Sequence, residues 1–418
     1  MINKVEFKGF KYIDGGVCAA QGFKANGIQC GLAHAGASVT KKKNDLAVII
    51  ADNECSAAAV YTSNKVKGAP IAVTKKNIAD GKARGVIVNS VNANTCNADG
   101  SEKAQKMCEL AAKEFGLKAE DFIVASTGVI GQPLPIEPIE KGVPELCKGV
   151  KYDGNKAAVE AIMTTDTCPK EVAVEFEIGG RKCVMGGMLK GSGMIHPNMA
   201  TTLSFITTDA AIAPEYLQRA LSDTVKTTLN MVSVDGDQST NDMCCVMANG
   251  MAGNAEIKGE NEDFETFKNA LYVIMMNLAR MMARDGEGAT KLIECVCSGA
   301  DDFLTAKTVA KSVIMSSLFK AAIFGEDANW GRILCAVGYA DAEFDINSVD
   351  VDLASSAGIV AVCRNGAGVD FSEEEAKKIL EEEEIKVLVK IGDGEVSAVA
   401  WGCDLTYDYV KINGDYRS

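Results

Sequence analysis

A threonine near the middle of the chain has the surroundings of a self-activated nucleophile. The segment KGSGMIHPNMATTLSFITTDA runs from Lys190 to Ala210, and Thr201 follows a glycine-rich stretch and a proline. A threonine hydroxyl is a weak nucleophile until a base removes its proton. The chain has only two histidines, His34 and His196, so a histidine base is scarce. An α-amino group, with a pKa of about 7.7–8.0, could be that base if the peptide bond before Thr201 were cut.

Such a cut needs only groups of the chain itself. The Thr201 hydroxyl would attack the carbonyl of Ala200, the acyl group would move from nitrogen to oxygen, and water would hydrolyse the ester. Glycines before the bond and Pro197 after His196 let the backbone present it in a strained, exposed geometry. A glycine-rich turn that leads into a core strand explains the same residues without chemistry.

Composition argues against several other classes of protein. The 418 residues carry a formal net charge of −14, which repels nucleic-acid backbones and anionic lipid. We expect no signal peptide and no membrane span, because no apolar run reaches ~18 residues. The sequence has no Walker A motif, no HExxH and no CxxC. The fifteen scattered cysteines are typical of reduced thiols in a cytoplasmic protein, and we expect no metal.

Helical and strand patterns alternate along the chain, which predicts a layered α/β fold with sheets in the middle. Apolar spacing predicts helices at about 101–115, 214–230, 263–284, 305–322 and from Ser372 onward. Strands are predicted at LAVIIA, RGVIVNSV, DFIVAST, EVAVEFEIGGRKCVMGGML and TLSFITTDA. The proline-rich segment 133–144 predicts an irregular connection, and the alternation around Asp393-Gly394 predicts a hairpin.

Many segments of the chain resemble one family. KGSGMIHPNMATT is similar to the processing motif of the ornithine acetyltransferases, the bifunctional ornithine acetyltransferase/N-acetylglutamate synthases of arginine biosynthesis. Further similar segments follow in the family's order over nearly the whole chain: GFKANGIQCGL, AAAVYTSNKVKGAPI, ASTGVIG, IMTTDT, SVDGDQSTND, DGEGATK, FGEDANWGR and INGDYRS. The resemblance implies the layered α/β sandwich of the ornithine acetyltransferase and self-processing aminopeptidase type, with an N-terminal threonine nucleophile.

The resemblance implies cleavage between Ala200 and Thr201, with Thr201 as the nucleophile of the mature enzyme. The products would be an α-chain of residues 1–200 and a β-chain of residues 201–418, which stay associated, with α2β2 as the implied assembly.

The catalytic and substrate-binding groups can also be carried over by resemblance. The Thr127 hydroxyl and the Gly128 N–H match the two donors of an oxyanion hole, which favour the negative oxygen of a tetrahedral intermediate. Lys190 would bind the substrate α-carboxylate and Glu287 the ornithine ammonium. The implied substrate contacts are Thr164 (with Thr165 as the alternative register), Lys190, Thr201, Glu287, Asn413 and Ser418.

Three residues depart from the family's pattern or stay without a role. Thr202 stands where methionine commonly follows the nucleophile, which could slow self-cleavage or leave it unaffected. Val91 stands where a glycine is common. His196 lies at a variable position, and the segment SVDGDQSTND, although acidic, lacks the spacing of a calcium loop.

The implied reaction moves an acetyl group from N2-acetylornithine to glutamate through an acetyl-Thr201 ester, without metal or other cofactor. The sequence leaves open whether acetyl-CoA is a second donor. Two alternatives remain: a self-processing aminopeptidase or amidohydrolase with water as acceptor, and a non-catalytic α/β binding protein.

Overall fold

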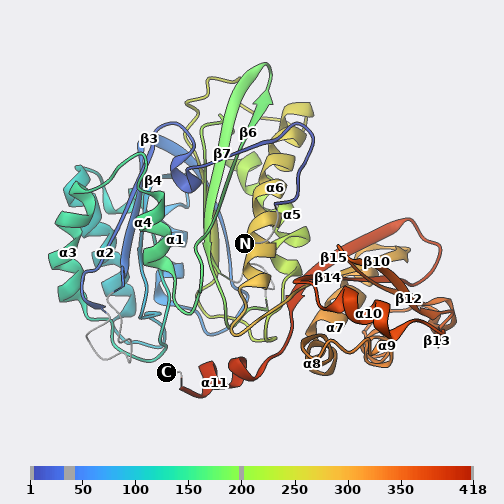
Figure 1. Ribbon diagram of the computed structural model, residues 1–418. Helices are drawn as coiled ribbons and strands as arrows, with labels where there is room; N and C mark the ends of the chain where they lie inside the picture. The colour runs from blue at the N-terminus through green and yellow to red at the C-terminus, as the bar shows by residue number, and fades with distance from the viewer. Residues whose placement is uncertain (1–3, 33–42, 197–201, 416–418) are drawn as a thin grey trace.

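Two β-sheets organise the chain, one in each of two lobes (Figure 1). The computed structural model describes residues 4–32, 43–196 and 202–415. Within these residues, the strands of the larger lobe are β1 (Lys11–Ile13), β2 (Phe23–Ile28), β3 (Leu46–Tyr61), β4 (Lys82–Asn89), β5 (Phe122–Ser126), β6 (Lys170–Ile178), β7 (Arg181–Lys190), β8 (Leu203–Thr208) and β9 (Met243–Ala248). Their order is β1-β6-β7-β8-β9-β3-β4-β5, and β2 pairs with β3.

Helices pack around this sheet, as the predicted layering requires. They are α1 (Ala69–Asn77), α2 (Gly100–Phe115), α3 (Ile136–Lys148), α4 (Asn155–Ile162), α5 (Pro214–Thr227) and α6 (Glu262–Arg284). The helix α6 packs on β6 and β7 and buries Phe264, Phe267 and Leu271 in the core. Full burial of a side chain of that size contributes roughly 1.5–3 kcal/mol. The Asn261 side chain caps α6 by accepting a hydrogen bond from the Phe264 N–H over 3.0 Å.

The smaller lobe holds the second sheet, in the order β13-β12-β11-β14-β10-β15. Its strands are β10 (Leu292–Ala300), β11 (Asp350–Ser355), β12 (Gly358–Arg364), β13 (Ala367–Gly368), β14 (Glu384–Lys390) and β15 (Val396–Cys403). Its helices are α7 (Phe303–Met315), α8 (Ser317–Phe324), α9 (Trp330–Gly338) and α10 (Glu373–Leu380), and α11 (Tyr407–Asp415) follows β15. From β15 the chain returns beneath the larger lobe as α11 (Figure 1).

The boundary between the expected α- and β-chains does not coincide with the boundary between the lobes. β7 and β8 are antiparallel neighbours in the larger sheet, with Lys190 opposite Leu203. The bond between Ala200 and Thr201 lies outside the described residues, but the strands before and after it belong to one sheet. The lobes instead divide between α6 and β10.

The mixed α/β class is confirmed, and three local expectations need correction. β14 and β15 flank Asp393-Gly394 but form no hairpin, because β10 lies between them, parallel to β14 and antiparallel to β15. The segment 133–144 is irregular only up to Pro135, because α3 begins at Ile136. The predicted helix 305–322 is two helices, α7 and α8, which meet at Ser316.

The described part of the chain contains no helix that combines the length and apolar character needed to cross a bilayer.

Candidate active site

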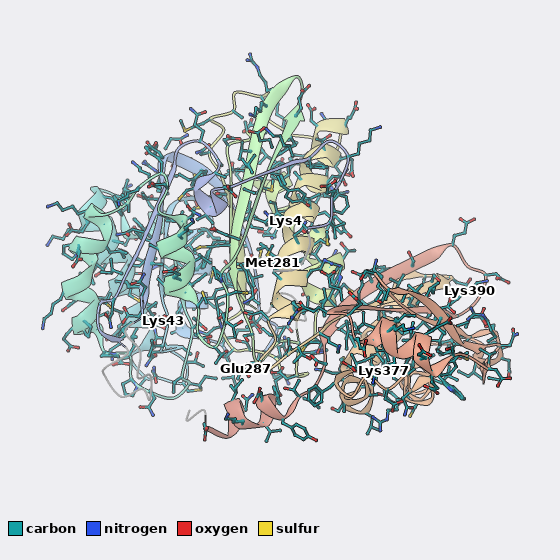
Figure 2. The ribbon with its side chains drawn as sticks, in the orientation of Figure 1. Lys4, Lys43, Met281, Glu287, Lys377 and Lys390 are labelled. Carbon is teal, nitrogen blue, oxygen red and sulfur yellow. The ribbon has the colours of Figure 1, made fainter. Side chains whose placement is uncertain are left out.

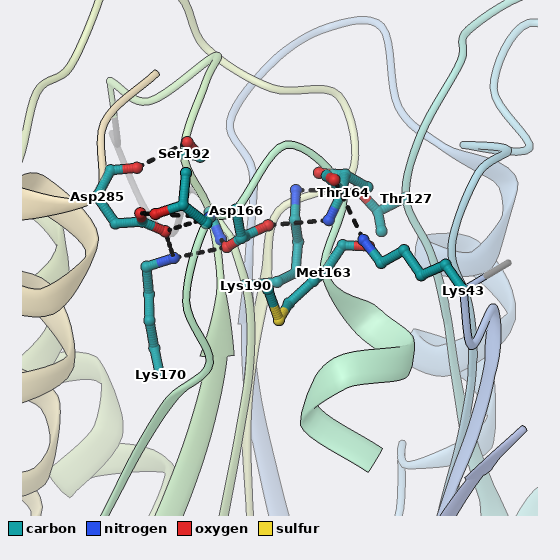
Figure 3. A network of polar contacts seen from close by, with 11 residues as sticks. Lys43, Thr127, Met163, Thr164, Asp166, Lys170, Lys190, Ser192 and Asp285 are labelled. Atoms are coloured by element: carbon teal, nitrogen blue, oxygen red, sulfur yellow. Dashed lines mark hydrogen bonds and ion pairs between the residues drawn. The ribbon is translucent and has the colours of Figure 1, made fainter. Parts of the chain in front are cut away.

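Two strand ends bring Thr127 and Lys190 together. Thr127 directly follows β5, Lys190 is the last residue of β7, and the Lys190 Nζ donates to the Thr127 Oγ1 over 3.3 Å (Figure 3). An ammonium group donates but cannot accept, so the Thr127 proton remains available to a developing oxyanion. Both side chains line a small cavity of about 20 Å³ that also touches Gly193 and Leu203, on either side of the expected cleavage point.

Gly128 follows Thr127, and the residues Thr127, Gly128 and Lys190 together form the oxyanion corner. The backbone of Gly128 has a conformation that only glycine adopts easily. Its φ is +132°, and a Cβ on it would lie 2.2 Å from the Val91 carbonyl oxygen. The neighbouring Val129 N–H donates to that carbonyl over 2.9 Å, which fixes the turn. Among the described residues, the Gly128 N–H has no hydrogen-bond acceptor. The turn therefore leaves one backbone donor beside one hydroxyl donor, which is the arrangement expected of an oxyanion hole.

Val91, whose carbonyl holds this turn, has a backbone conformation that is unfavourable for a residue with a β-branched side chain. Its φ is +76°, in the left-handed region, where a β-branched residue is an outlier. The sequence expectation of a glycine at this position therefore has a backbone reason.

We expect Val91→Gly to raise the free energy of unfolding by about 1 kcal/mol. Relief of roughly 1–3 kcal/mol of strain outweighs the ~0.5–1 kcal/mol cost of glycine's extra chain entropy. Denaturant titration would measure the change. Val184→Gly, at an extended and half-buried position of β7, is the control and should lower stability. A loss of stability in both variants would mean that Val91 is not strained.

A buried ionic network lies behind Lys190 (Figure 3). The Lys170 Nζ donates to Asp166 Oδ1 over 2.7 Å and also to Asp285 Oδ2. Burial alone would raise the pKa of Asp166, but the charges of Lys170 and Lys190 outweigh burial and hold that pKa below its ordinary value. Burial would lower the pKa of Lys170, and the two carboxylates instead raise it. Asp166 and Lys170 are therefore both charged at neutral pH.

The network joins three segments that carry predicted substrate contacts. Asp166 accepts from the Thr164 N–H over 2.9 Å and from the Gly191 N–H, next to Lys190, over 2.8 Å. The Asp285 carbonyl accepts from the Ser192 hydroxyl over 2.7 Å. Sequence reasoning assigned no role to Lys170, Asp166 or Asp285. The available signal was a lysine at the start of the apolar run EVAVEFEI, where a buried cation needs partners.

Glu287 and Asn413 meet although they lie far apart in the sequence. The Asn413 Nδ2 donates to Glu287 Oε2 over 2.7 Å, so α11 returns to the larger lobe at this residue (Figure 2). A Cβ on Gly193 would lie 2.4 Å from the Glu287 carboxylate, which places that carboxylate against the loop before the expected cleavage point.

The segment SVDGDQSTND also forms hydrogen bonds with the loop before the expected cleavage point. The Asp235 carboxylate accepts from the Met194 N–H over 2.7 Å and from the Ile195 N–H over 2.9 Å. The Asn241 Nδ2 donates to the Ser126 carbonyl over 2.9 Å, directly before Thr127. These residues position the loop and the oxyanion corner, and this is a role that the sequence did not reveal.

The predicted site residues thus fall into three sets. Thr127, Gly128 and Lys190 form one corner, and Glu287 with Asn413 forms a second. The backbone of Thr164 is fixed by Asp166, and its carbonyl accepts from the Lys43 Nζ over 3.1 Å. The remaining predictions, Ala200, Thr201 and Ser418, lie outside the described residues.

The chain matches known proteins over almost its full length. Residues 27–418 match the family model described as the ArgJ family. The arginine biosynthesis bifunctional protein ArgJ 1 of Clostridium acetobutylicum is 49% identical over 398 residues, which are 95% of this chain and 96% of that protein. The arginine biosynthesis bifunctional protein ArgJ of Caldanaerobacter subterraneus subsp. tengcongensis is 47% identical over 407 residues, 97% of this chain and 99% of that protein.

A solved structure is also similar to part of the chain. It is ornithine acetyltransferase complexed with ornithine from Mycobacterium tuberculosis, with 32% identity and a TM-score of 0.41, and it covers 46% of this chain and 100% of that one.

The two full-length relatives define the class of this protein as an α/β enzyme of arginine biosynthesis. The chain belongs to the ArgJ family.

Proposed function

We propose that this enzyme of arginine biosynthesis transfers the acetyl group of N2-acetylornithine to glutamate by a ping-pong reaction. The observation that carries the proposal is the corner formed by Thr127, Gly128 and Lys190, where Thr127 and Lys190 share a cavity with Thr202, the next residue after Thr201 in the sequence. The relatives' names place them in arginine biosynthesis, and the similar solved structure contains ornithine.

The first half-reaction begins after scission of the bond between Ala200 and Thr201. The new α-amino group takes the Thr201 hydroxyl proton, and Oγ1 attacks the acetyl carbonyl of N2-acetylornithine. The Thr127 hydroxyl and the Gly128 N–H stabilise the oxyanion. Collapse of the tetrahedral intermediate breaks the amide bond, and the departing ornithine amine takes the proton held by the α-amino group.

The second half-reaction reverses the first with a different amine. The α-amino group of glutamate attacks the acetyl-Thr201 ester, and N-acetylglutamate leaves as Oγ1 regains its proton. An amide is exchanged for a similar amide, so the net free-energy change is near zero and no metal or nucleotide is required.

The substrate contacts follow from charge. Lys190 would bind the α-carboxylate, and Glu287, held by Asn413, would bind the side-chain ammonium of ornithine. Acetyl-CoA is proposed as a second donor, in line with the word bifunctional in the relatives' names.

Assays of N2-acetylornithine with and without glutamate test the proposal. The transferase makes N-acetylglutamate only when glutamate is present, whereas a hydrolase of the aminopeptidase type releases acetate in both assays. Labelled acetyl-CoA with glutamate tests the second donor, and native mass spectrometry tests the α2β2 assembly. Release of acetate without any N-acetylglutamate would reject the transferase.

The pH dependence of kcat/KM for N2-acetylornithine should reveal the titration of Lys190. Burial and the neighbouring Lys170 lower its pKa below the ordinary 10.5, although Asp166, Asp242 and Glu287 oppose that shift. Since the neutral amine cannot pair with a carboxylate, kcat/KM for N2-acetylornithine should fall as pH rises through a value below 10.5. Lys190→Arg, which stays charged, should lack this alkaline decline. A wild-type profile that stays flat to pH 10.5 would contradict the assignment, provided circular dichroism shows folded protein.

A C-terminal extension should impair the enzyme. Asn413 contacts Glu287 near the end of the chain, so a bulky tag after Ser418 is expected to lower kcat/KM about tenfold, the loss typical of a disturbed binding contact. The same tag at the N-terminus is the control. Full activity with the C-terminal tag would show that the last residues do not line the site.

A further inference from the structure

A second, larger pocket borders His196, in the loop that leads to the expected cleavage point. Its volume is about 340 Å³, within the range of small-molecule sites. It is formed by the loop residue His196, by one face of α7 and by the residues after α9. The lining residues are His196, Lys307, Thr308, Lys311, Ser312, Met315, Tyr339, Ala340 and Asp341.

The pocket gathers positive charge in a chain that is strongly negative overall. Lys307 and Lys311 lie one turn apart on the same face of α7, and His196 faces them across the pocket. Asp341 is the only carboxylate among the described lining residues. Lys311 donates to the Asn230 carbonyl over 3.1 Å, which fixes the position of its ammonium in the pocket lining.

The electrostatic interactions among these groups favour the binding of an anion. Burial and the repulsion from Lys307 lower the pKa of Lys311 to about 8. Burial and the two lysines lower the pKa of His196 to about 4. Lys307 and Lys311 are close enough to disfavour each other's charge, and a bound anion would favour both ammonium groups and the protonation of His196.

The other residues that line the pocket could contact a flat ring that is attached to the bound anion. Tyr339 is 59% exposed and Met315 is 42% exposed, so both side chains are accessible to a ligand in the pocket. Thr308 and Ser312 add hydroxyl groups on the same face of α7. An aromatic ring and a thioether beside two ammonium groups form a surface on which a flat ring can stack while its anionic group reaches the lysines.

We propose that this pocket binds a small phosphomonoester, with the phosphate held by Lys307, Lys311 and His196 and an attached flat ring stacked on Tyr339. A dianionic phosphate pairs with several cations at once, which a carboxylate does less well. The site touches neither Thr127 nor Lys190, so it is separate from the acetyl-transfer site and does not depend on the transferase proposal.

Isothermal titration with three probes tests the ligand class. Inorganic phosphate should bind, AMP should bind more tightly because its base can stack, and adenosine should not bind. Lys307→Gln should weaken AMP binding about tenfold, since a charge-assisted contact is lost. Lys377→Gln, an exposed lysine of α10 outside the pocket, is the matched control and should bind like the wild type (Figure 2). Tyr339→Ala should reduce AMP binding to the level of phosphate.

Proton NMR of the histidines gives an independent readout. The variant His34→Gln leaves His196 as the only histidine, and its pKa should rise from about 4 when AMP is added, because the bound phosphate stabilises the imidazolium. The proposal is overturned if neither phosphate probe binds at millimolar concentration or if adenosine binds as well as AMP. Equal weakening by Lys307→Gln and Lys377→Gln, or AMP binding that leaves the His196 pKa unchanged, would overturn it too.

Discussion

The variant Thr201→Ala should accumulate as one uncut chain of 44.1 kDa and should show no measurable acetyl transfer. The methyl side chain cannot attack the Ala200 carbonyl, so scission stops. It also cannot form the acetyl ester, so turnover should fall by at least about 10⁴-fold, as for other covalent nucleophiles. Intact-mass spectrometry and the N-acetylglutamate assay measure the two effects on the same sample.

The adjacent threonine provides the matched control. Thr202 is buried, and its hydroxyl has no hydrogen-bond partner within the described residues. Thr202→Val keeps the shape and removes only this unpaired hydroxyl, so scission and activity should both survive. Normal scission of Thr201→Ala would refute the nucleophile assignment, and loss of scission in Thr202→Val alone would transfer the role to Thr202.

Thr127→Val should lower kcat about 10²–10³-fold with a much smaller effect on KM. The side chains have nearly the same shape, but valine cannot donate to the oxyanion that forms only in the transition state. The Gly128 N–H remains, which explains why the loss is smaller than for Thr201→Ala. Pre-steady-state bursts would give kcat per cleaved active site, so that slower scission is not counted as slower turnover.

Thr127→Ser tests whether the hydroxyl itself is responsible. Serine keeps the donor and the contact with the Lys190 Nζ, so kcat should return to within about tenfold of the wild type. If Thr127→Val raised KM and left kcat unchanged, the hydroxyl would be a substrate contact rather than an oxyanion donor.

The site residues could be proposed from the sequence because each lies in a short motif that resembles one family. Thr127 with Gly128 lies in ASTGVIG, and Glu287 lies in DGEGATK. The buried network could not be found in this way, because Asp166 is close to Lys170 in the sequence but Asp285 comes from a distant segment that only the fold brings near. Local patterns record which residue types occur, whereas the pairing of buried charges depends on long-range packing.

The same distinction between local pattern and long-range packing explains the errors in the predicted strand pairing and helix bounds. Apolar alternation identified β14 and β15 correctly, but alternation describes which faces are buried and not which strand lies alongside. Prolines suggested irregular backbone where α3 begins, although Pro138 lies in the first turn of a helix, where a missing N–H costs little. The helix α6 and the strand β8 were predicted almost to their ends, whereas the single predicted run EVAVEFEIGGRKCVMGGML is two strands, β6 and β7.

The antiparallel pairing of β7 with β8 has a consequence for the life of the molecule once the proposed cut is made. The precursor can fold as one chain, with both strands tethered at a high effective concentration. The mature pair has lost that tether, so after full denaturation its recovery would be a second-order process that slows on dilution. Its durability in the cell would then depend on how slowly it unfolds rather than on how readily it refolds.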